Sequence, residues 1–412
     1  MRDASGGGFG ADFWKLLVGQ TVSSLGSSFT VFALPLLVFK LTGSAFDLAL
    51  VTVAEYVPYL IFGLIIGAWV DRVDRKRLMV FADIAQAGVI CSIPLLSILG
   101  TLPVWWIYAV GFVSSTLWIC FNTAEFVAVR ELVRTERLMA ANGHLQASYS
   151  AASVVGPVLA GLLVALVPIH TLLLFDALSF LLSALAVGLI RARLDATGRE
   201  GRGLRGVYRE VTEGLRHVFG HPVLRGICLM LALVNGVGFT VYAQLVLFAK
   251  ERFAASDTQV AILYAAGGVG MIVLALAAGP VRRYLSFSKA VLGALMAGGV
   301  LILLLAAARW YWAATVLWAA IWGLVIFVDV NSNTLLQTAV PERLLGRVRS
   351  VVSVLSWSAI PLGTLLGGVA IERVQNVSLV YGAIGAAILL CGVAFSFTAV
   401  GHAHRYLPSE KA

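Results

Sequence analysis

The loop between the second and third apolar runs of this chain reads Gly67-Ala-Trp-Val-Asp71-Arg72-Val-Asp74-Arg75-Lys76-Arg77. The run before it covers residues 45–70, the run after it covers residues 78–99, and neither contains Lys or Arg. A helix needs about 20 predominantly apolar residues to cross the hydrocarbon core of a bilayer. The loop is therefore a short, strongly charged turn between two helices that each span a membrane.

The composition of the whole chain agrees with this interpretation. Of the 412 residues, 60% are hydrophobic and only 12% are charged, and the mean hydropathy is +0.92. A soluble domain typically carries about 25% charged residues, so a water-soluble fold is excluded. The runs are continuously apolar, whereas the strands of a membrane barrel alternate, so the sequence predicts an all-α membrane protein.

Twelve such runs can be counted between charged and turn residues. In the first half they cover residues 13–39, 45–70, 78–99, 103–127, 142–167 and 170–190. In the second half they cover residues 224–249, 258–281, 288–308, 311–333, 348–371 and 377–400. We therefore expect twelve transmembrane helices.

The distribution of positive charge predicts the orientation of these helices. Cytoplasmic loops retain Lys and Arg during insertion. Placing both termini in the cytoplasm leaves five of the 30 Lys and Arg residues outside, namely Lys40, Lys250, Arg252, Arg309 and Arg373. The net charge of +9 is then explained by loops that face anionic lipid rather than by nucleic acid. We expect a multi-pass protein of the inner membrane.

The chain divides near its midpoint. A polar, Arg-rich segment at residues 191–223 separates residues 1–190 from residues 224–412, and its part at 207–219 has the pattern of an interfacial helix or of a solvated linker helix. The sequence Glu-Arg-Leu at Glu136 recurs 206 residues later at Glu342. Because both copies lie before corresponding helices, we expect two pseudo-symmetric six-helix bundles.

The loop at residues 67–77 resembles the signature Gly-x-x-x-Asp-Arg-x-Gly-Arg-Arg of the major facilitator superfamily, with Asp74 in place of the second glycine. Ala141-Asn142, Gly156-Pro157 and Gly346-Arg347-Val348 look like patterns of the branch that contains macrolide and siderophore exporters. The resemblance covers residues 13–400. It implies the major facilitator fold, with a substrate site between the halves.

The charged loop is a candidate conformational latch. Asp71 can accept from free N–H groups at a helix N-terminus, and its basic neighbours can pair with acids such as Glu131. The resemblance implies that the acceptor is the start of the eleventh helix. An alternative is that the basic residues only anchor the loop on the cytoplasmic side. The candidate latch residues are Gly67, Asp71, Arg72, Arg75, Glu131, Gly346 and Arg347.

Acidic residues inside the predicted helices are candidates for proton coupling. Each costs about 2.5–3.5 kcal/mol on insertion scales when it lies at a helix centre. Asp83 and Asp176 lie near helix ends, where a structural role or contact with the interface is expected. Glu55, Glu125 and Asp329 have no such explanation. We expect at least one of them to carry a proton; the alternative is that they only hydrogen-bond neighbouring helices.

Polar and aromatic residues on otherwise apolar helices are candidates for the cavity lining. They are Gln20, Ser24, Asn122, Asn235, Tyr242, Asn333 and Trp357. Small polar residues such as Ser24 can equally mediate close helix packing. Such a lining suits bulky amphipathic or cationic solutes. Gly156, Pro157 and Gly161 look like the kinked glycine–proline pattern of facilitator antiporters, which favours export by exchange.

Together these features predict a secondary transporter that exports a drug-like, macrolide-like or siderophore-like molecule in exchange for protons. The alternatives are uptake or facilitated flux of a nutrient or lipid, and a membrane sensor or assembly partner that has kept the fold. No ATP-binding loop, zinc spacing or nucleophile elbow indicates an enzyme. We expect a monomer whose partners are its substrate, protons and the bilayer, with no cofactor, metal or nucleic acid.

Overall fold

The computed structural model describes residues 9–70, 73–134, 137–192, 194, 204–282 and 284–403. Across these residues the secondary structure is helical throughout, without a strand. The first seven helices are α1 (Ala11–Thr42), α2 (Ala45–Val70), α3 (Arg75–Ile98), α4 (Val104–Leu132), α5 (Leu138–Leu163), α6 (Ile169–Gly188) and α7 (Leu204–Gly220). The others are α8 (Pro222–Ala243), α9 (Leu245–Phe253), α10 (Asp257–Arg282), α11 (Phe287–Ala307), α12 (Tyr311–Ala339), α13 (Glu342–Val374) and α14 (Val377–Ser396).

Twelve helices in the described part of the chain are long and apolar enough to cross a membrane, which confirms the predicted number. The two that are not are α7 and α9. The amphipathic segment predicted at 207–219 lies within α7. The span predicted as one helix at 224–249 is instead divided into α8 and α9 at Gln244. Gln244 is fully buried, and its side chain donates to the carbonyl of Ala45 over 2.7 Å.

The chain forms two compact units. The first unit contains residues 1–38 and 57–204, and the second unit contains residues 39–56 and 205–412. Both α1 and α2 therefore begin in one unit and end in the other. Each change of unit lies within three residues of a proline inside the helix, Pro35 in α1 and Pro58 in α2. The segment 39–56 thus packs with helices that follow it by more than 150 residues in sequence.

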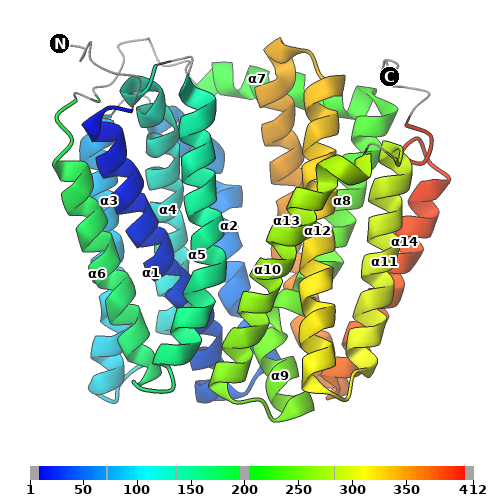
Figure 1. Cartoon of the computed structure of the whole chain (residues 1–412), viewed down its shortest axis with the longest axis horizontal. Coiled ribbons are helices and arrows are strands. Elements are labelled where there is room, and N and C mark those ends of the chain that lie inside the picture. The colour runs from blue at the N-terminus through cyan, green and yellow to red at the C-terminus, as the bar shows by residue number, and fades with distance from the viewer. Residues whose placement is uncertain are drawn as a thin grey trace. The chain divides into compact units, whose positions relative to one another are not determined.

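In the first unit, α3 packs along both α4 and α6 (Figure 1). The core between the helices contains Phe13, Leu16, Met79, Phe121 and Val187. Because lipid tails are as apolar as these side chains, helix association in a bilayer rests on close packing and on polar contacts between helices.

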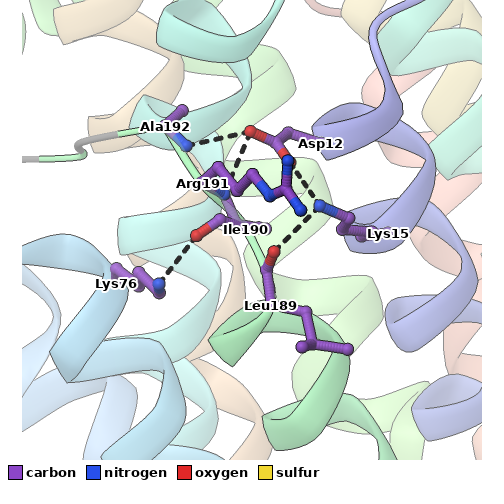
Figure 2. A network of polar contacts seen from close by, with 7 residues as sticks. All are labelled: Asp12, Lys15, Lys76, Leu189, Ile190, Arg191 and Ala192. Atoms are coloured by element: carbon purple, nitrogen blue, oxygen red, sulfur yellow. Dashed lines mark hydrogen bonds and ion pairs between the residues drawn. The ribbon is translucent and has the colours of Figure 1, made fainter.

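One such set of polar contacts joins the ends of three helices in the first unit (Figure 2). Asp12 accepts from Lys15 over 2.7 Å and from the backbone N–H of Ala192 over 2.9 Å. Lys15 also donates to the carbonyl of Leu189, and Lys76 donates to the carbonyl of Ile190 over 2.7 Å. The side chains of α1 and α3 thereby satisfy carbonyl groups that the end of α6 leaves without helical partners.

In the second unit, α10 packs along α12, α11 along α14 and α8 along α13 (Figure 1). The last pair approaches closely at two glycines. A Cβ atom at Gly363 would lie only 1.5 Å from the carbonyl oxygen of Gly236. The absence of side chains there brings the two backbones together, as is common in membrane helix pairs.

Candidate functional site

The second unit encloses a cavity of about 430 Å³. Its walls come mainly from α8, α11, α12 and α13, and α2 contributes Tyr56. The wall formed by α12 extends from Trp318 to Leu336, so the cavity follows this helix for most of its length. Binding sites for drug-sized ligands typically have volumes of about 300–1,000 Å³, so the cavity can hold such a molecule.

One end of the cavity is aromatic. The rings of Tyr56 and Phe239 lie 5.1 Å apart, and those of Tyr242 and Trp322 lie 5.0 Å apart, both in edge-to-face geometry. Trp318 lies 5.9 Å from Trp322, one helical turn away on α12. Edge-to-face rings at these distances attract one another and form a rigid apolar surface.

The other end of the cavity is polar and charged. Asp329 on α12 and Arg349 on α13 both line it, both are exposed, and their charges interact. Asn333 donates to Oδ2 of Asp329 over 3.0 Å. Asn235 on α8 also lines the cavity and donates to the carbonyl of Ser356 over 3.2 Å. A ligand in this cavity meets aromatic rings at one end and a pair of opposite charges at the other.

The structure brings some of the predicted lining residues together. Asn235, Tyr242, Asn333 and Trp357 line the cavity together with Asp329. Glu55 precedes Tyr56 on α2, is half-buried, and interacts electrostatically with Tyr242 and Tyr264.

Several lining residues were not predicted from the sequence, above all Arg349, which lies at the start of the predicted eleventh helix. The others include Tyr56, Phe239 and the pair Trp318 and Trp322. The spacing of four between the two tryptophans was the available signal, because it places both rings on one face of a helix.

Three further lining candidates, Gln20, Ser24 and Asn122, belong to the first unit, and Gln20 contributes to a separate polar network there. Gln20 on α1 donates to the hydroxyl of Tyr149 on α5 over 2.9 Å, and that hydroxyl donates to Oε2 of Glu125 on α4 over 2.9 Å. Glu125 is 4% exposed, and its Oε1 has no hydrogen-bond partner in the described part of the chain. Ser24 and Asn122 are half-buried in the same unit.

Two other acids of the first unit are more deeply buried than expected. Asp83 and Asp176 are each only 1% exposed, which contradicts contact with the interface and leaves the structural role as the remaining expectation. Asp176 accepts from the hydroxyls of Thr30 and Ser27 on α1. Asp83 lies close enough to Glu125 for the two carboxyl groups to interact electrostatically.

The glycine–proline segment lies in α5, which remains helical through Pro157. Gly156 faces α1, because a Cβ atom there would lie 1.6 Å from Oγ of Ser28. Gly161 and Pro157 are buried on the same helix. The segment therefore permits close contact between α5 and α1 within the first unit.

The predicted latch residues fall into separate groups. Arg75 is 1% exposed and donates to Oε1 of Glu131 over 2.5 Å. Gly67 lies near the end of α2, whereas Asp71 and Arg72 lie outside the described residues. Asp74, which replaces the glycine of the signature, accepts from the N–H of Arg77 over 3.0 Å and so caps the N-terminus of α3.

In the second unit, the candidate acceptor region belongs to α13, which contains Gly346 and begins at Glu342. Arg347 forms an ion pair with Glu213 on α7. A Cβ atom at Gly214 would lie 3.0 Å from the carbonyl oxygen of Arg347. The amphipathic helix α7 is thus held against the first turns of α13.

Residues 39–56 are held in the second unit by a group of polar contacts that we call the outer clamp. Asp257 accepts from Lys40 over 2.5 Å and from Lys250 over 2.6 Å. Glu372 accepts from the hydroxyl of Ser44 over 2.6 Å and from the N–H of Phe46 over 3.1 Å. Lys40 and Lys250 are two of the cations that the predicted orientation places outside.

The profile of the Major Facilitator Superfamily matches residues 16–364. The multidrug efflux pump Tap of Mycolicibacterium fortuitum is 29% identical over 93% of this chain and 94% of its own length. Macrolide efflux protein A of Streptococcus pyogenes is 26% identical over 88% of this chain and 90% of its own length.

Solved structures share the fold. A bacterial homologue of the human lysosomal transporter Spinster, in an inward-facing and unoccupied conformation, superimposes with a TM-score of 0.75. The match covers 97% of this chain and 98% of that one, although the two are only 14% identical.

Proposed function

The chain belongs to the Major Facilitator Superfamily, and from this we propose that it exports an amphipathic, drug-like molecule across the inner membrane in exchange for protons. It is a multi-pass membrane transporter of small molecules and not an enzyme. The direction of transport, the substrate and the coupling ion are our proposal. The names of its relatives, a multidrug efflux pump and a macrolide efflux protein, support export.

The observation that carries the proposal is the cavity of the second unit. Its volume of about 430 Å³ and its five clustered aromatic rings suit a bulky apolar body. Asp329, Asn333 and Arg349 supply the few polar groups that would orient such a molecule. A nutrient such as a sugar would need many more hydrogen-bonding groups, so this lining favours an amphipathic substrate over a polar one.

Glu125 is the best placed of the three proton-coupling candidates. Its carboxyl group is buried, and only one of its two oxygens has a hydrogen-bond partner among the described residues. A protonated carboxyl can donate a hydrogen bond as well as accept one, so the free oxygen can carry the proton. Asp329 is the second candidate because substrate and proton would compete for it directly. Glu55, close to Tyr242, is the third.

Coupling to protons supplies the energy for export. Moving one charge across the membrane potential is worth about 2.3 kcal/mol per 100 mV. In our proposal the outer clamp stabilises the state that is closed to the outside, and the loop around Asp71 stabilises the state that is closed to the cytoplasm. With both termini in the cytoplasm, the outer clamp lies on the outside of the membrane. The monomeric state stays a prediction.

The test is flux in proteoliposomes that contain the purified protein and a pH gradient. We expect an amphipathic dye to move against its concentration gradient only when the gradient or potential drives protons the opposite way, and a protonophore to stop it. Expression in a pump-deficient bacterium, scored against a panel of antibiotics and metallophores, would identify the substrate. Movement driven only by an inward substrate gradient would instead indicate uptake or facilitated flux.

A further inference from the structure

The two charged residues that line the cavity have opposite signs. Asp329 and Arg349 are the charged side chains among the described lining residues, and both are exposed to the cavity. They come from different helices, α12 and α13, and their charges interact. The lining therefore has no net charge, although each charge is available to a ligand.

We propose that Arg349 determines the charge selectivity of the transporter, so that the cavity prefers molecules with a neutral or zwitterionic polar group over molecules with a single positive charge. The inference rests on the proposed function, because it describes the substrate of the same cavity. Arg349 acts as a counterion within the same cavity wall, where its charge offsets that of Asp329.

Each of the two charges creates an electrostatic potential in the cavity. An acid alone in a cavity with apolar walls attracts cations, because the field is screened less there than in bulk water. Arg349 offsets this potential, and an incoming cation must compete with the positive charge of Arg349 near Asp329. A ligand with a hydroxyl or a zwitterionic group avoids this competition because it can contact the acid and the base together.

The position of the pair along α12 gives the ligand an orientation. Asp329 follows Trp322 by seven residues, which is about 10 Å along a helix with a rise of about 1.5 Å per residue. A flat apolar body packed against the rings of Trp322 and Tyr242 would thus place its polar group near Asp329 and Arg349 when body and polar group are joined by a short chain. We infer an elongated amphipathic substrate rather than a compact one.

Direct binding can be measured because the cavity contains three tryptophans, Trp318, Trp322 and Trp357. Energy transfer from tryptophan to pyrene would report binding of four probes to the full-length protein in detergent. The probes share a pyrene ring and a four-carbon chain and end in a hydroxyl, a betaine, a trimethylammonium or a carboxylate group. Their shared body makes the ratio of two affinities a measure of the polar group alone.

For the wild-type protein we expect the hydroxyl and betaine probes to bind more tightly than the trimethylammonium probe. Arg349→Gln should raise the affinity for the trimethylammonium probe relative to the hydroxyl probe by about five- to tenfold, since no positive charge in the lining then offsets Asp329. Arg349→Lys should keep the wild-type order. Arg373→Gln is the matched control because it removes a positive charge from the same helix outside the cavity lining, and it should change nothing.

Asp329→Asn provides an independent variant should Arg349→Gln fold poorly. It removes the negative charge of residue 329 from the lining. The affinity for the carboxylate probe should therefore rise about five- to tenfold relative to the affinity for the trimethylammonium probe. Unchanged affinity ratios in either variant would overturn the proposal, as would a shift of the same size in Arg373→Gln. Failure of the proposed function would look different: the ratios would shift as expected, but proteoliposomes would show no proton-driven flux of any probe.

Discussion

The hydroxyl of Tyr149 donates a 2.9 Å hydrogen bond to Oε2 of Glu125, and the two residues come from different helices of the first unit. Gln20, from a third helix, donates to the same hydroxyl. The acid is therefore held in place by a neutral network rather than by a cation. A network of this kind fixes the position of the carboxyl group without forcing it to remain ionised.

Replacing Glu125 with Gln should abolish the release of protons when substrate binds in detergent, because an amide cannot exchange a proton near neutral pH. Tyr149→Phe should leave proton release present but shifted in pH, since it removes only one hydrogen bond to the carboxyl group. A pH indicator in weakly buffered protein solution measures both. Glu251→Gln, at an exposed acid on α9, is the control. Normal proton release from Glu125→Gln and from Asp329→Asn would place the coupling residue elsewhere.

Asp71→Asn should leave the protein inserted and folded but reduce transport severely. The substitution removes the negative charge of the predicted latch and keeps the size of the side chain. Flux in proteoliposomes and the thermal stability of the same preparation separate the two effects. Asp74→Asn is the comparison, because an Asn at that position can still cap α3. Wild-type flux in the Asp71 variant would exclude the latch.

Glu131→Gln should destabilise the protein, because it removes a negative charge that pairs with the buried guanidinium of Arg75. Removing one partner of a fully buried pair typically costs about 3–5 kcal/mol. The side chain of Glu131 is 25% exposed, so we expect a smaller loss of about 1–3 kcal/mol. Thermal unfolding in detergent measures the loss. Arg75→Met combined with Glu131→Gln should recover part of it, and a strictly additive double variant would argue against direct coupling.

Removing both acids of the outer clamp, with Asp257→Ala and Glu372→Ala, should release residues 39–56 and favour the state that is open to the outside. A cysteine introduced by Tyr56→Cys, in a background without the four native cysteines, would report this. We expect a membrane-impermeant maleimide added outside to label it faster in the double variant. Glu251→Ala serves as the control, and equal labelling rates in all backgrounds would exclude a gating role for the clamp.

Gly363→Ala should reduce stability by about 1–3 kcal/mol or more, as expected for overpacking of a close contact. The new Cβ atom would lie 1.5 Å from the carbonyl oxygen of Gly236, and backbone atoms cannot move aside as a side chain can. Gly293→Ala on α11 is the matched control, because nothing lies within 4 Å of its Cβ position. Thermal unfolding of both variants gives the difference. Equal stability of the two variants would contradict the close approach of α8 and α13.

Much of the architecture could be predicted from the sequence, because a bilayer imposes a length and a polarity on each helix. The apolar runs and the distribution of Lys and Arg were sufficient to count the spans. The division at Gln244 was not predicted, because no Gly or Pro marks it in the sequence and the hydrogen-bond partner of the Gln244 side chain, Ala45, is 199 residues away. The partners of Asp176 could not be predicted for the same reason. Its partners, Thr30 and Ser27, lie on a helix distant in sequence.

The cavity shows a similar limit. Polarity alone identified Asp329, Asn235 and Asn333, since such residues are rare within transmembrane helices. Arg349 follows the start of α13 by only seven residues, where a cation is expected for reasons of orientation. Its place in the cavity lining depends on residues of α12 such as Asp329, and no local sequence pattern on α13 indicates that neighbour.

The assignment of residues 39–56 to the second unit has a practical consequence for dividing the gene. A fragment that starts after the central Arg-rich segment would carry Asp257 and Glu372 without Lys40, Ser44 and Phe46, and would lack Tyr56 from its cavity wall. Chimeras joined at the midpoint of two homologous transporters would likewise combine a hairpin from one parent with the binding surface of the other. A chimera that takes residues 39–56 and the C-terminal half from the same parent keeps the contacts of the outer clamp and of Tyr56 intact.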